Sequence, residues 1–324
     1  MDFLSKGLGT VNCLLRPLGL NLQRNCSRED MDALLAAQIR YGRMTCGYPA
    51  EGVVFSKDRP MQLHALLSSY FEKVRDPAPL YLIYKALDPR YGKAYAEVIK
   101  AFSGRLAGAF PDVSFRETLI SVLDKINAEK IFFLVDDIVF IEDMDFADFA
   151  KFDTRFFVPS LRMGNNLRYC YAADKNMPLP KFLPGTIADR DKACWRWGDG
   201  SYEWGYPLSV DGHLFTTLEV RVMAQRIDFQ APNSFESGLQ RFKPLFRKRY
   251  GVCYLKSKIV NIPCNIVQKE ISNRHGNMDP LFLLEKWNSG LQIDYKKLYG
   301  AANISAHADL PVTFTKRDMD AGTV

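Results

Sequence analysis

Apolar and polar positions alternate along the first half of the chain in a way that predicts strands and helices in turn. Each short apolar run is followed by a segment with apolar residues three or four positions apart, the spacing of an amphipathic helix. This alternation predicts a parallel sheet with helices on its faces, linked by right-handed crossovers. The expected strands are 53–55, 81–84, 113–115 and 131–135, and the expected helices are 60–74, 94–102 and 117–127.

The apolar run at 131–135 leads directly into two carboxylates, Asp136 and Asp137. Continuous apolarity predicts a strand buried on both faces, as in a parallel sheet. Adjacent acids at its end are costly, because desolvation and mutual repulsion both disfavour the charged pair. A divalent cation, Mg²⁺ or Mn²⁺, is the simplest compensation, since magnesium is usually held by one or two carboxylates plus substrate phosphates. The alternative is that the pair caps the turn after the strand.

Polar residues also follow the other predicted strands, so they are expected at the same edge of the sheet. Ligands of such sheets bind beyond the carboxyl ends of the strands. A proline at the first position of a helix leaves amide groups free to attract an anion, and an arginine beside it can pair with a phosphate. The grouping predicts a nucleotide diphosphate pocket, with candidate residues Ser56, Asp58, Arg59, Pro60, Asp88, Arg116 and Asp136.

Composition narrows the class of protein. With 324 residues, 47% of them hydrophobic, the chain is long enough for one large α/β domain with appendages. A net charge of +6 without a long basic block permits contact with phosphates or an anionic membrane surface and gives no sign of nucleic-acid binding. Seven scattered cysteines predict free thiols in a reducing compartment. With no convincing secretory signal or membrane span, we expect a cytoplasmic protein, peripheral at most to the inner face of a membrane.

The stretches FSKDRP at 55–60, YKA at 84–86 and LVDD at 134–137 resemble the nucleotide-sugar-binding half of GT-A fold glycosyltransferases. The resemblance covers roughly residues 50–270. It implies that a DxD-type motif holds Mn²⁺ or Mg²⁺ against the donor diphosphate, although here Val135 precedes two adjacent acids. On the resemblance, Asp137 is assigned to the metal and Asp136 to the ribose or a bridging water, with the two roles exchangeable. The resemblance also implies a late histidine ligand, for which His275 and His307 are candidates and His213 is third.

The expected organisation has four segments. Residues 1–50 form a helical appendage whose helix opens at Ser27, and a weak membrane or partner contact through Leu14, Arg16 and Leu18 is the alternative use of this region. The nucleotide-binding half spans 51–160, and a small mixed acceptor-side region spans 161–280. Residues 281–324 form a peripheral extension that is helical and then polar.

The acceptor half is expected to be rich in aromatic contacts. Three of the four tryptophans lie within 195–207, interleaved with glycines. Flat rings of this kind can stack on a sugar. We expect the acceptor platform at Trp204, with Tyr206 and His213 beside it. For Trp195 and Trp197, the alternative is the core of a small mixed sheet.

Two acids compete for the role of catalytic base. Glu236 lies near the start of a helix expected after Pro232, where GT-A enzymes often carry an xED-like acid, although only the Glu is present here. The helix dipole is expected to lower its pKa. The ordinary interpretation is an acid that satisfies the helix start. Asp211, in a loop with Gly212, is the competing base.

Together, these features predict a metal-dependent glycosyltransferase of the hexosyl class. It would move a sugar from a nucleotide diphosphate donor to a hydroxyl acceptor, a glycan or lipid-linked sugar, in polysaccharide biosynthesis. One alternative is a nucleotidyltransferase acting on a sugar phosphate, which needs the same acids and divalent ion. The other is a non-catalytic carbohydrate-binding protein with a degenerate site.

Overall fold

A five-stranded sheet lies at the centre of the computed structural model, which describes residues 26–40, 49–265, 276 and 278–317. Four of its strands are parallel, and the fifth, β12, runs antiparallel to β5. The strand order is β12-β5-β1-β3-β4. The strands are β1 (Ala50–Lys57), β3 (Leu80–Lys85), β4 (Leu106–Pro111), β5 (Lys130–Val135) and β12 (Leu214–Thr216). The prediction of an α/β fold with a mostly parallel, helix-flanked sheet is confirmed.

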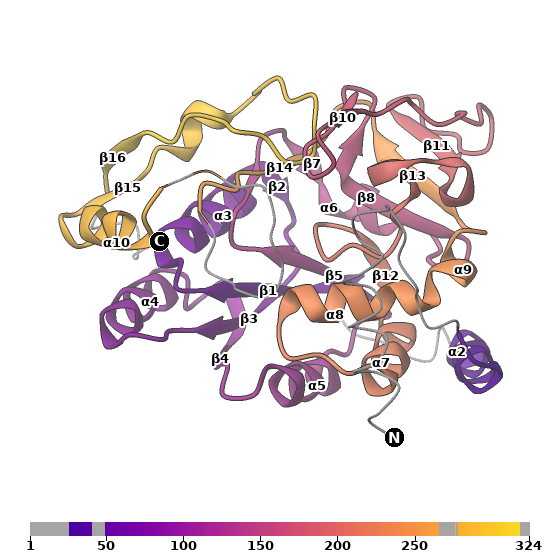
Figure 1. Cartoon of the computed structure of the whole chain (residues 1–324), viewed down its shortest axis with the longest axis horizontal. Coiled ribbons are helices and arrows are strands. Elements are labelled where there is room, and N and C mark those ends of the chain that lie inside the picture. The colour runs from indigo at the N-terminus through magenta and orange to yellow at the C-terminus, as the bar shows by residue number, and fades with distance from the viewer. Residues whose placement is uncertain (1–25, 41–48, 266–275, 277, 318–324) are drawn as a thin grey trace.

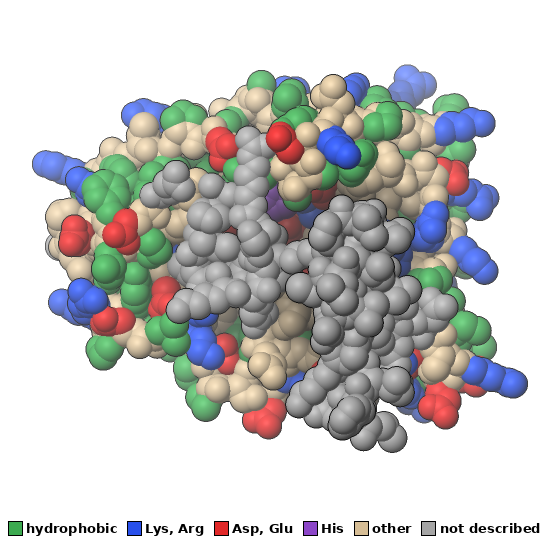
Figure 2. Space-filling view, viewed as in Figure 1, with side chains coloured by type: hydrophobic (Ala, Val, Ile, Leu, Met, Phe, Trp, Pro, Cys, Tyr) green, Lys and Arg blue, Asp and Glu red, His purple; other side chains and the backbone are tan. Residues whose placement is uncertain are grey.

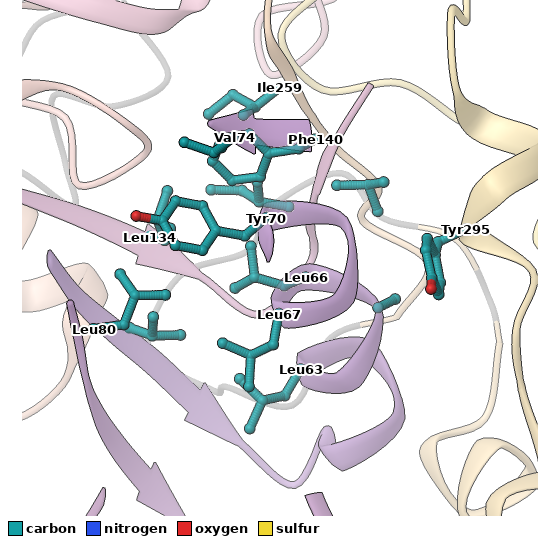
Figure 3. Close-up of a cluster of buried hydrophobic side chains, with 14 of the residues drawn as sticks. Leu63, Leu66, Leu67, Tyr70, Val74, Leu80, Leu134, Phe140, Ile259 and Tyr295 are labelled. Atoms are coloured by element: carbon teal, nitrogen blue, oxygen red, sulfur yellow. The ribbon is translucent and has the colours of Figure 1, made fainter. Parts of the chain in front are cut away.

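Helices cover both faces of this sheet (Figure 1). On one face lie α3 (Pro60–Lys73) and α4 (Pro89–Ala101), and on the other lie α5 (Phe115–Lys125) and α7 (Thr217–Arg226). Side chains alternate along β1, so Val54 joins the first core and Val53 joins the second. Figure 3 shows the first core, where apolar residues of α3 pack against Leu80 and Leu134 of the sheet.

One predicted strand is wrong. The third parallel strand is β4, and the segment 113–115 leads into α5 instead. Val113 is 89% exposed, and Ser114 precedes the first helical residue, Phe115, with extended backbone angles. These residues were predicted as a strand because two of them are apolar, but Phe115 begins a helix and Val113 faces solvent.

A second, smaller sheet is built from three later strands. Its order is β11-β13-β8, with β13 antiparallel to β11 and parallel to β8, so the predicted small mixed region is present. Its strands are β8 (Phe157–Gly164), β11 (Lys192–Arg196) and β13 (Tyr250–Tyr254). Trp195 and Trp197 are fully buried against this sheet. Both therefore belong to the core of a small mixed sheet, which was the alternative given for them in the sequence analysis.

Short elements complete the described chain. Two-stranded pairs join β2 (Val74–Arg75) to β7 (Met144–Asp145), β6 (Ile138–Phe140) to β14 (Ile259–Asn261), β9 (Tyr169–Cys170) to β10 (Lys175–Asn176), and β15 (Leu291–Ile293) to β16 (Phe314–Lys316). The remaining α-helices are α2 (Arg28–Arg40), α6 (Phe146–Ala150), α8 (Pro232–Leu239), α9 (Lys243–Phe246) and α10 (Pro280–Asn288). Short 3-10 turns lie at Trp197–Asp199, Tyr202–Gly205, Gln240–Phe242 and Tyr295–Leu298.

The helix α2 is held against α7 by polar contacts as well as apolar ones. Its start is capped reciprocally, since the amide of Ser27 donates to Asp30 and the amide of Asp30 donates to the hydroxyl of Ser27. Asp30 also pairs with Arg241, and Gln38 donates to Glu219 on α7. The predicted helix start at Ser27 is thus confirmed. The proposed membrane contact through Leu14, Arg16 and Leu18 lies outside the described residues.

The C-terminal segment is part of the main core and not a peripheral extension. Leu283, Leu284 and Trp287 of α10 are buried in the same cluster as α3 and the sheet. Tyr295 continues this contact and donates to Glu72 of α3. The prediction of a peripheral end is therefore wrong for this stretch.

The face seen in Figure 2 carries acidic and basic side chains interspersed among apolar ones. This mixture fits a chain with a modest net charge of +6. Among the residues that the structure describes, no helix is both long and apolar enough to cross a membrane.

Candidate functional site

A cleft of about 940 Å³ opens at the carboxyl edge of the parallel strands. It is lined by the ends of β1 and β5, including Ser56 and Asp136, and by residues of the acceptor half. The order β5-β1-β3-β4 means that the chain builds the sheet outward from β1 in one direction and then in the other. The neighbouring ends of β1 and β5 therefore form the switch point where such sheets bind ligands.

At the switch point, Asp136 is buried and fully hydrogen-bonded. Its carboxylate accepts from the hydroxyl of Ser56 at 2.9 Å, the amide of Lys57 at 3.1 Å and Nη1 of Arg59 at 3.0 Å. Burial raises the pKa of Asp136, and Arg59 acts against that rise. Burial would also lower the pKa of Arg59, but Asp136 and Asp137 outweigh it and hold that pKa above its ordinary value. The counter-charge that the sequence attributed to a metal is supplied to Asp136 by Arg59.

Asp137 is less enclosed than its neighbour. Its Oδ1 accepts from Nδ2 of Asn261 at 3.1 Å, and its Oδ2 lies 3.5 Å from Nη1 of Arg59. Its side chain keeps 15% of its surface exposed to the cleft. Within the described residues, no group of three or more His, Cys, Asp or Glu side chains lies close enough to hold a metal by itself. The predicted ligand His275 lies outside the described residues.

A second charged cluster faces the cleft from the acceptor half and is centred on Arg162. Its guanidinium donates to Glu203 at 2.7 Å and to Ser209 at 2.8 Å, and lies 3.3 Å from Asp211. Its side chain is only 4% exposed. The sequence analysis missed Arg162. A signal was present, because this arginine interrupts the apolar run that forms β8.

Asp211 is the acid in this cluster with the most perturbed ionisation. Burial raises its pKa to about 8, with Arg162 acting against the rise and Glu236, Asp137 and Glu203 adding to it. Nε2 of His307 lies 3.9 Å from its carboxylate. Burial and Arg162 together lower the pKa of His307, so a positive charge on this histidine is disfavoured. Asp211 therefore changes charge near neutral pH.

Glu236 lines the same wall of the cleft, and its carboxylate accepts three hydrogen bonds. Its carboxylate accepts from the amide of Val210 at 2.7 Å, the hydroxyl of Tyr206 at 3.0 Å and the hydroxyl of Ser209 at 3.2 Å. Burial raises its pKa, although these donors act against the rise. The predicted lowering by the helix dipole is therefore wrong. The helix begins at Pro232, so Glu236 lies beyond the first turn, where the dipole is weak.

The structure rules out two of the three predicted acceptor contacts. Trp204 is fully buried, and its backbone carbonyl accepts from the indole of Trp195. His213 is 1% exposed, its Nδ1 lies 2.9 Å from the carbonyl of Pro207, and burial lowers its pKa to about 3. Neither ring offers a face to a ligand, because both fill the core behind the cleft. Tyr206 does line the cleft, and Tyr202, which the analysis had not singled out, joins it on the rim.

Four predicted donor-site residues have local structural roles and do not line the cleft in the described structure. Asp58 adopts a positive φ of 52° and accepts from the amide of Leu87. Asp88 caps α4 and pairs with Arg90. Arg116 donates to backbone carbonyls at 225 and 227. Pro60 begins α3 as predicted. Their placement at one sheet edge was right, but each side chain is used by its own turn or helix.

The cleft has a further wall that the sequence did not indicate. Phe55, Ile83 and Phe115 give it an apolar lining between β1, β3 and α5. Asp112 and Lys85 lie at its edge, 3.4 Å apart. One oxygen of Asp112, Oδ1, is buried without a hydrogen-bond partner among the described residues. An apolar slot with an acceptor and a cation at its edge suits a flat heterocycle with N–H groups.

No family model matches the sequence, and no curated protein matches it. Among solved structures, TarS from S. aureus matches at 12% identity with a TM-score of 0.42, over 65% of this chain and 36% of that one. A TarS structure of residues 1–349 in complex with UDP matches at the same identity and TM-score, over 59% of its length. This chain therefore spans less than two thirds of either structure.

Two other solved structures match at similar distance. WbbM, described as a bifunctional glycosyltransferase, has 11% identity and a TM-score of 0.35, over 66% of this chain and 40% of that one. A nucleotidyl transferase from Methanothermobacter, Mth528, has 13% identity and a TM-score of 0.36, over 67% and 89% of the two chains. One of these matched structures is thus described as a glycosyltransferase and another as a nucleotidyl transferase.

Proposed function

We propose that the protein is a glycosyltransferase that moves a sugar from a nucleotide diphosphate sugar to a hydroxyl acceptor. The observation that carries the proposal is one cleft with two separate acidic groups, Asp136 and Asp137 at the switch point and Asp211 and Glu236 opposite. Glycosyl transfer needs both, because the leaving diphosphate must be stabilised and the attacking hydroxyl must lose a proton. A hexosyl donor and a role in polysaccharide biosynthesis are part of the proposal.

The donor half of the cleft supports this assignment. The nucleoside would occupy the apolar slot of Phe55, Ile83 and Phe115, with Asp112 accepting from the base. The ribose and phosphates would then reach the ends of β1 and β5, beside Ser56 and Asp136. Arg59, whose guanidinium pairs with Asp136, is a cation in this part of the cleft.

The described residues can coordinate a divalent ion only if the substrate supplies some of its ligands. Asp137, with Asp136 beside it, would hold Mn²⁺ or Mg²⁺, and phosphate oxygens would supply the other ligands. The bound ion would neutralise charge on the leaving diphosphate. His275 remains a predicted further ligand.

For the base we propose Asp211 in preference to Glu236. A general base works best when its pKa lies near the operating pH, and burial raises that of Asp211 to about 8. Its carboxylate has Arg162 as an ion-pair partner, whereas three donors engage Glu236. Glu236 would act as a positioning residue, since it holds the backbone and hydroxyl of residues 209–210 next to the base.

The deciding experiment is calorimetric titration with a panel of nucleoside diphosphates, with Mn²⁺ and with EDTA. One member of the panel should bind with an affinity that EDTA lowers. Asp137→Asn should abolish the effect of Mn²⁺ on this affinity while thermal unfolding stays the same, because it removes a charge at nearly constant shape. The matched control is Asp143→Asn, since Asp143 is 85% exposed and lies outside the cleft.

Other outcomes would favour the rival functions. A nucleotidyltransferase should bind a nucleoside triphosphate more tightly than any diphosphate or sugar diphosphate in the same panel. A non-catalytic carbohydrate-binding protein should bind sugars with an affinity that EDTA leaves unchanged, and should turn over no donor. If Asp137→Asn keeps the full Mn²⁺ effect, the metal site lies elsewhere.

A further inference from the structure

Most cations that line the cleft already have carboxylate partners. Arg59 pairs with Asp136 and Asp137, Arg162 with Glu203 and Asp211, and Lys85 with Asp112. Three other cations in the lining, Lys57, Lys243 and Arg247, form no ion pair with any residue that the structure describes. Lys57 is at the end of β1, next to the proposed diphosphate. Lys243 and Arg247 lie on and just after α9, in contact with Tyr206 and Gly198 respectively.

Lys243 and Arg247 lie one helical turn apart, since the amide of Arg247 donates to the carbonyl of Lys243 at 2.9 Å. Lys243 is half-buried, and burial followed by repulsion from Arg247 lowers its pKa. The guanidinium of Arg247 donates to the carbonyl of Gly198 at 2.9 Å, which fixes its position without neutralising its charge. An anion bound between these side chains would relieve both the desolvation and the repulsion.

Their position relates the pair to the proposed reaction centre. The ammonium of Lys243 lies 5.6 Å from the ring centroid of Tyr206, on which it makes a cation–π contact. The hydroxyl of the same tyrosine donates to Glu236, which supports the loop that carries Asp211. One aromatic side chain therefore connects the two cations to the wall that carries the proposed base.

The cleft that these cations line also offers a ring for stacking. Tyr202 lines the cleft, is 43% exposed and adopts a positive φ of 49°. The turn that presents it is tight, since a Cβ on Gly200 would lie 2.1 Å from the carbonyl oxygen of Trp204. Two cations without an ion-pair partner among the described residues and an exposed tyrosine in the same cleft make a surface suited to a sugar that bears an anionic group.

We propose that Lys243 and Arg247 form a subsite for an anionic acceptor, so that the sugar accepting the transfer carries a phosphate or a carboxylate. This inference rests on the proposed glycosyltransferase function and names the class of its acceptor. The anion is held on the α9 side, and the reacting hydroxyl of the same molecule points toward Asp211.

The test uses three probes that share a ring and differ at one carbon: glucose, glucuronate and glucose 6-phosphate. Each is titrated into the full-length protein saturated with the nucleoside diphosphate that binds best. We expect an anionic probe to bind at least tenfold more tightly than glucose, as a charge-assisted contact would give. Preference for glucose 6-phosphate indicates a phosphate group in the acceptor, and preference for glucuronate indicates a carboxylate.

Variants connect this preference to the pair. Lys243→Ala and Arg247→Ala should each reduce the preference by roughly tenfold, and Lys243→Arg should retain most of it. Thermal unfolding confirms that each variant is folded. The control is Lys248→Ala, because Lys248 is an exposed neighbour that faces a separate groove beneath α2 and not the cleft.

Failure of the subsite differs from failure of the function. If a nucleoside diphosphate binds but all three probes bind equally, or if Lys243→Ala leaves their ratio unchanged, the acceptor subsite is overturned. If Lys243→Ala weakens the nucleoside diphosphate itself, the pair belongs to the donor site and the acceptor subsite is again overturned. If no nucleotide binds, the glycosyltransferase proposal fails first.

Discussion

Asp211 retains its proton at a pH where an ordinary carboxyl group has lost it, because it is buried close to three other acids. The folded protein therefore binds a proton that the unfolded chain has released, over the range from 3.8 to about 8. This difference makes the folded state less stable as the pH rises through that range. The same group must be ionised before it can accept a proton from a hydroxyl.

The first prediction at this scale concerns the pH dependence of transfer. The rate of transfer should rise with pH along a limb whose midpoint lies near 8, since only the ionised form of Asp211 is a base. Asp211→Asn should lower the rate by roughly a hundredfold or more and remove this limb. As the pH rises from 4 to 8, the free energy of unfolding of this variant should fall less than that of the parent protein. Initial rates and urea denaturation across this range provide the measurements.

The paired variant is Glu236→Gln. It should reduce stability, because three donors lose a charged acceptor, yet it should reduce transfer less than Asp211→Asn does. The opposite order, with Glu236→Gln inactive but folded and Asp211→Asn active, would return the role of base to Glu236 as the sequence suggested. If neither variant loses activity, the transfer does not need a protein base.

At the scale of residues, the sequence predicted acids better than aromatics. Four of the predicted acids, Asp136, Asp137, Asp211 and Glu236, line the cleft. A carboxylate after a buried strand or in a glycine loop destabilises the fold unless it is paired or binds a ligand, so its presence indicated a site. A buried tryptophan has no such cost, so Trp204 in a glycine-rich stretch could equally be core. Arg162 was missed because its partners lie more than 40 residues away in the chain.

At the scale of elements, β1 is the strand around which the parallel part of the central sheet is built. It pairs with both β3 and β5, and Gly52 is opposite Leu80 on one side and Phe132 on the other. A Cβ at this position would lie 2.5 Å from Cδ2 of Leu80 and 2.5 Å from Cζ of Phe132. The glycine is thus required by side chains of both neighbouring strands.

We predict that Gly52→Ala lowers the free energy of unfolding by about 1 to 3 kcal/mol, the usual cost of overpacking a core. Gly92→Ala in α4 is the matched control, because a Cβ there meets nothing within 4 Å. It should raise the stability by about 0.5 to 1 kcal/mol, since alanine has less backbone freedom to lose. Guanidinium denaturation of both variants measures the difference. Equal effects of the two would contradict the packing around β1.

Elements with a strong hydrophobic periodicity could be predicted from the sequence. The edge strand β4 could not. The helix at 60–74 and the strand at 131–135 differ from α3 and β5 by no more than a residue at either end. The strand β4, with the sequence LAGAFP, has small residues and is only partly buried at the sheet edge. Its pattern therefore had little apolar signal, and the nearby VSF at 113–115 looked more like a strand.

At the scale of the whole molecule, the C-terminal segment helps to hold the first core together. Trp287 is 1% exposed, its indole donates to Glu97 of α4 at 2.9 Å, and the guanidinium of Arg317 lies 3.7 Å from its ring centroid. The amphipathic pattern past about residue 281 predicted a helix here. It could not show which surface the apolar face covers, because that depends on contacts with residues about 190 positions earlier.

We predict that Trp287→Ala destabilises the protein by about 3 to 5 kcal/mol, as expected for deleting a buried tryptophan. Phe282→Ala on the same helix should cost less than about 1 kcal/mol, because Phe282 is 40% exposed. Chemical denaturation followed by far-UV circular dichroism would compare them. A small effect of Trp287→Ala would mean that the C-terminal segment is dispensable for the fold.

The antiparallel strand β12 has a consequence for how such a protein can diversify. The chain leaves β5 at Asp136 and returns through Gly212, whose amide donates to the carbonyl of Phe133. Residues 136 to 213 thus form an excursion that leaves the sheet at the end of β5 and returns beside Phe133 of the same strand. Strand register therefore sets the spacing between Asp136 and Asp211, the acids at the two ends of the excursion. Substitutions inside the excursion that preserve this register and the pairing of β8 with β13 would leave the two acids in place.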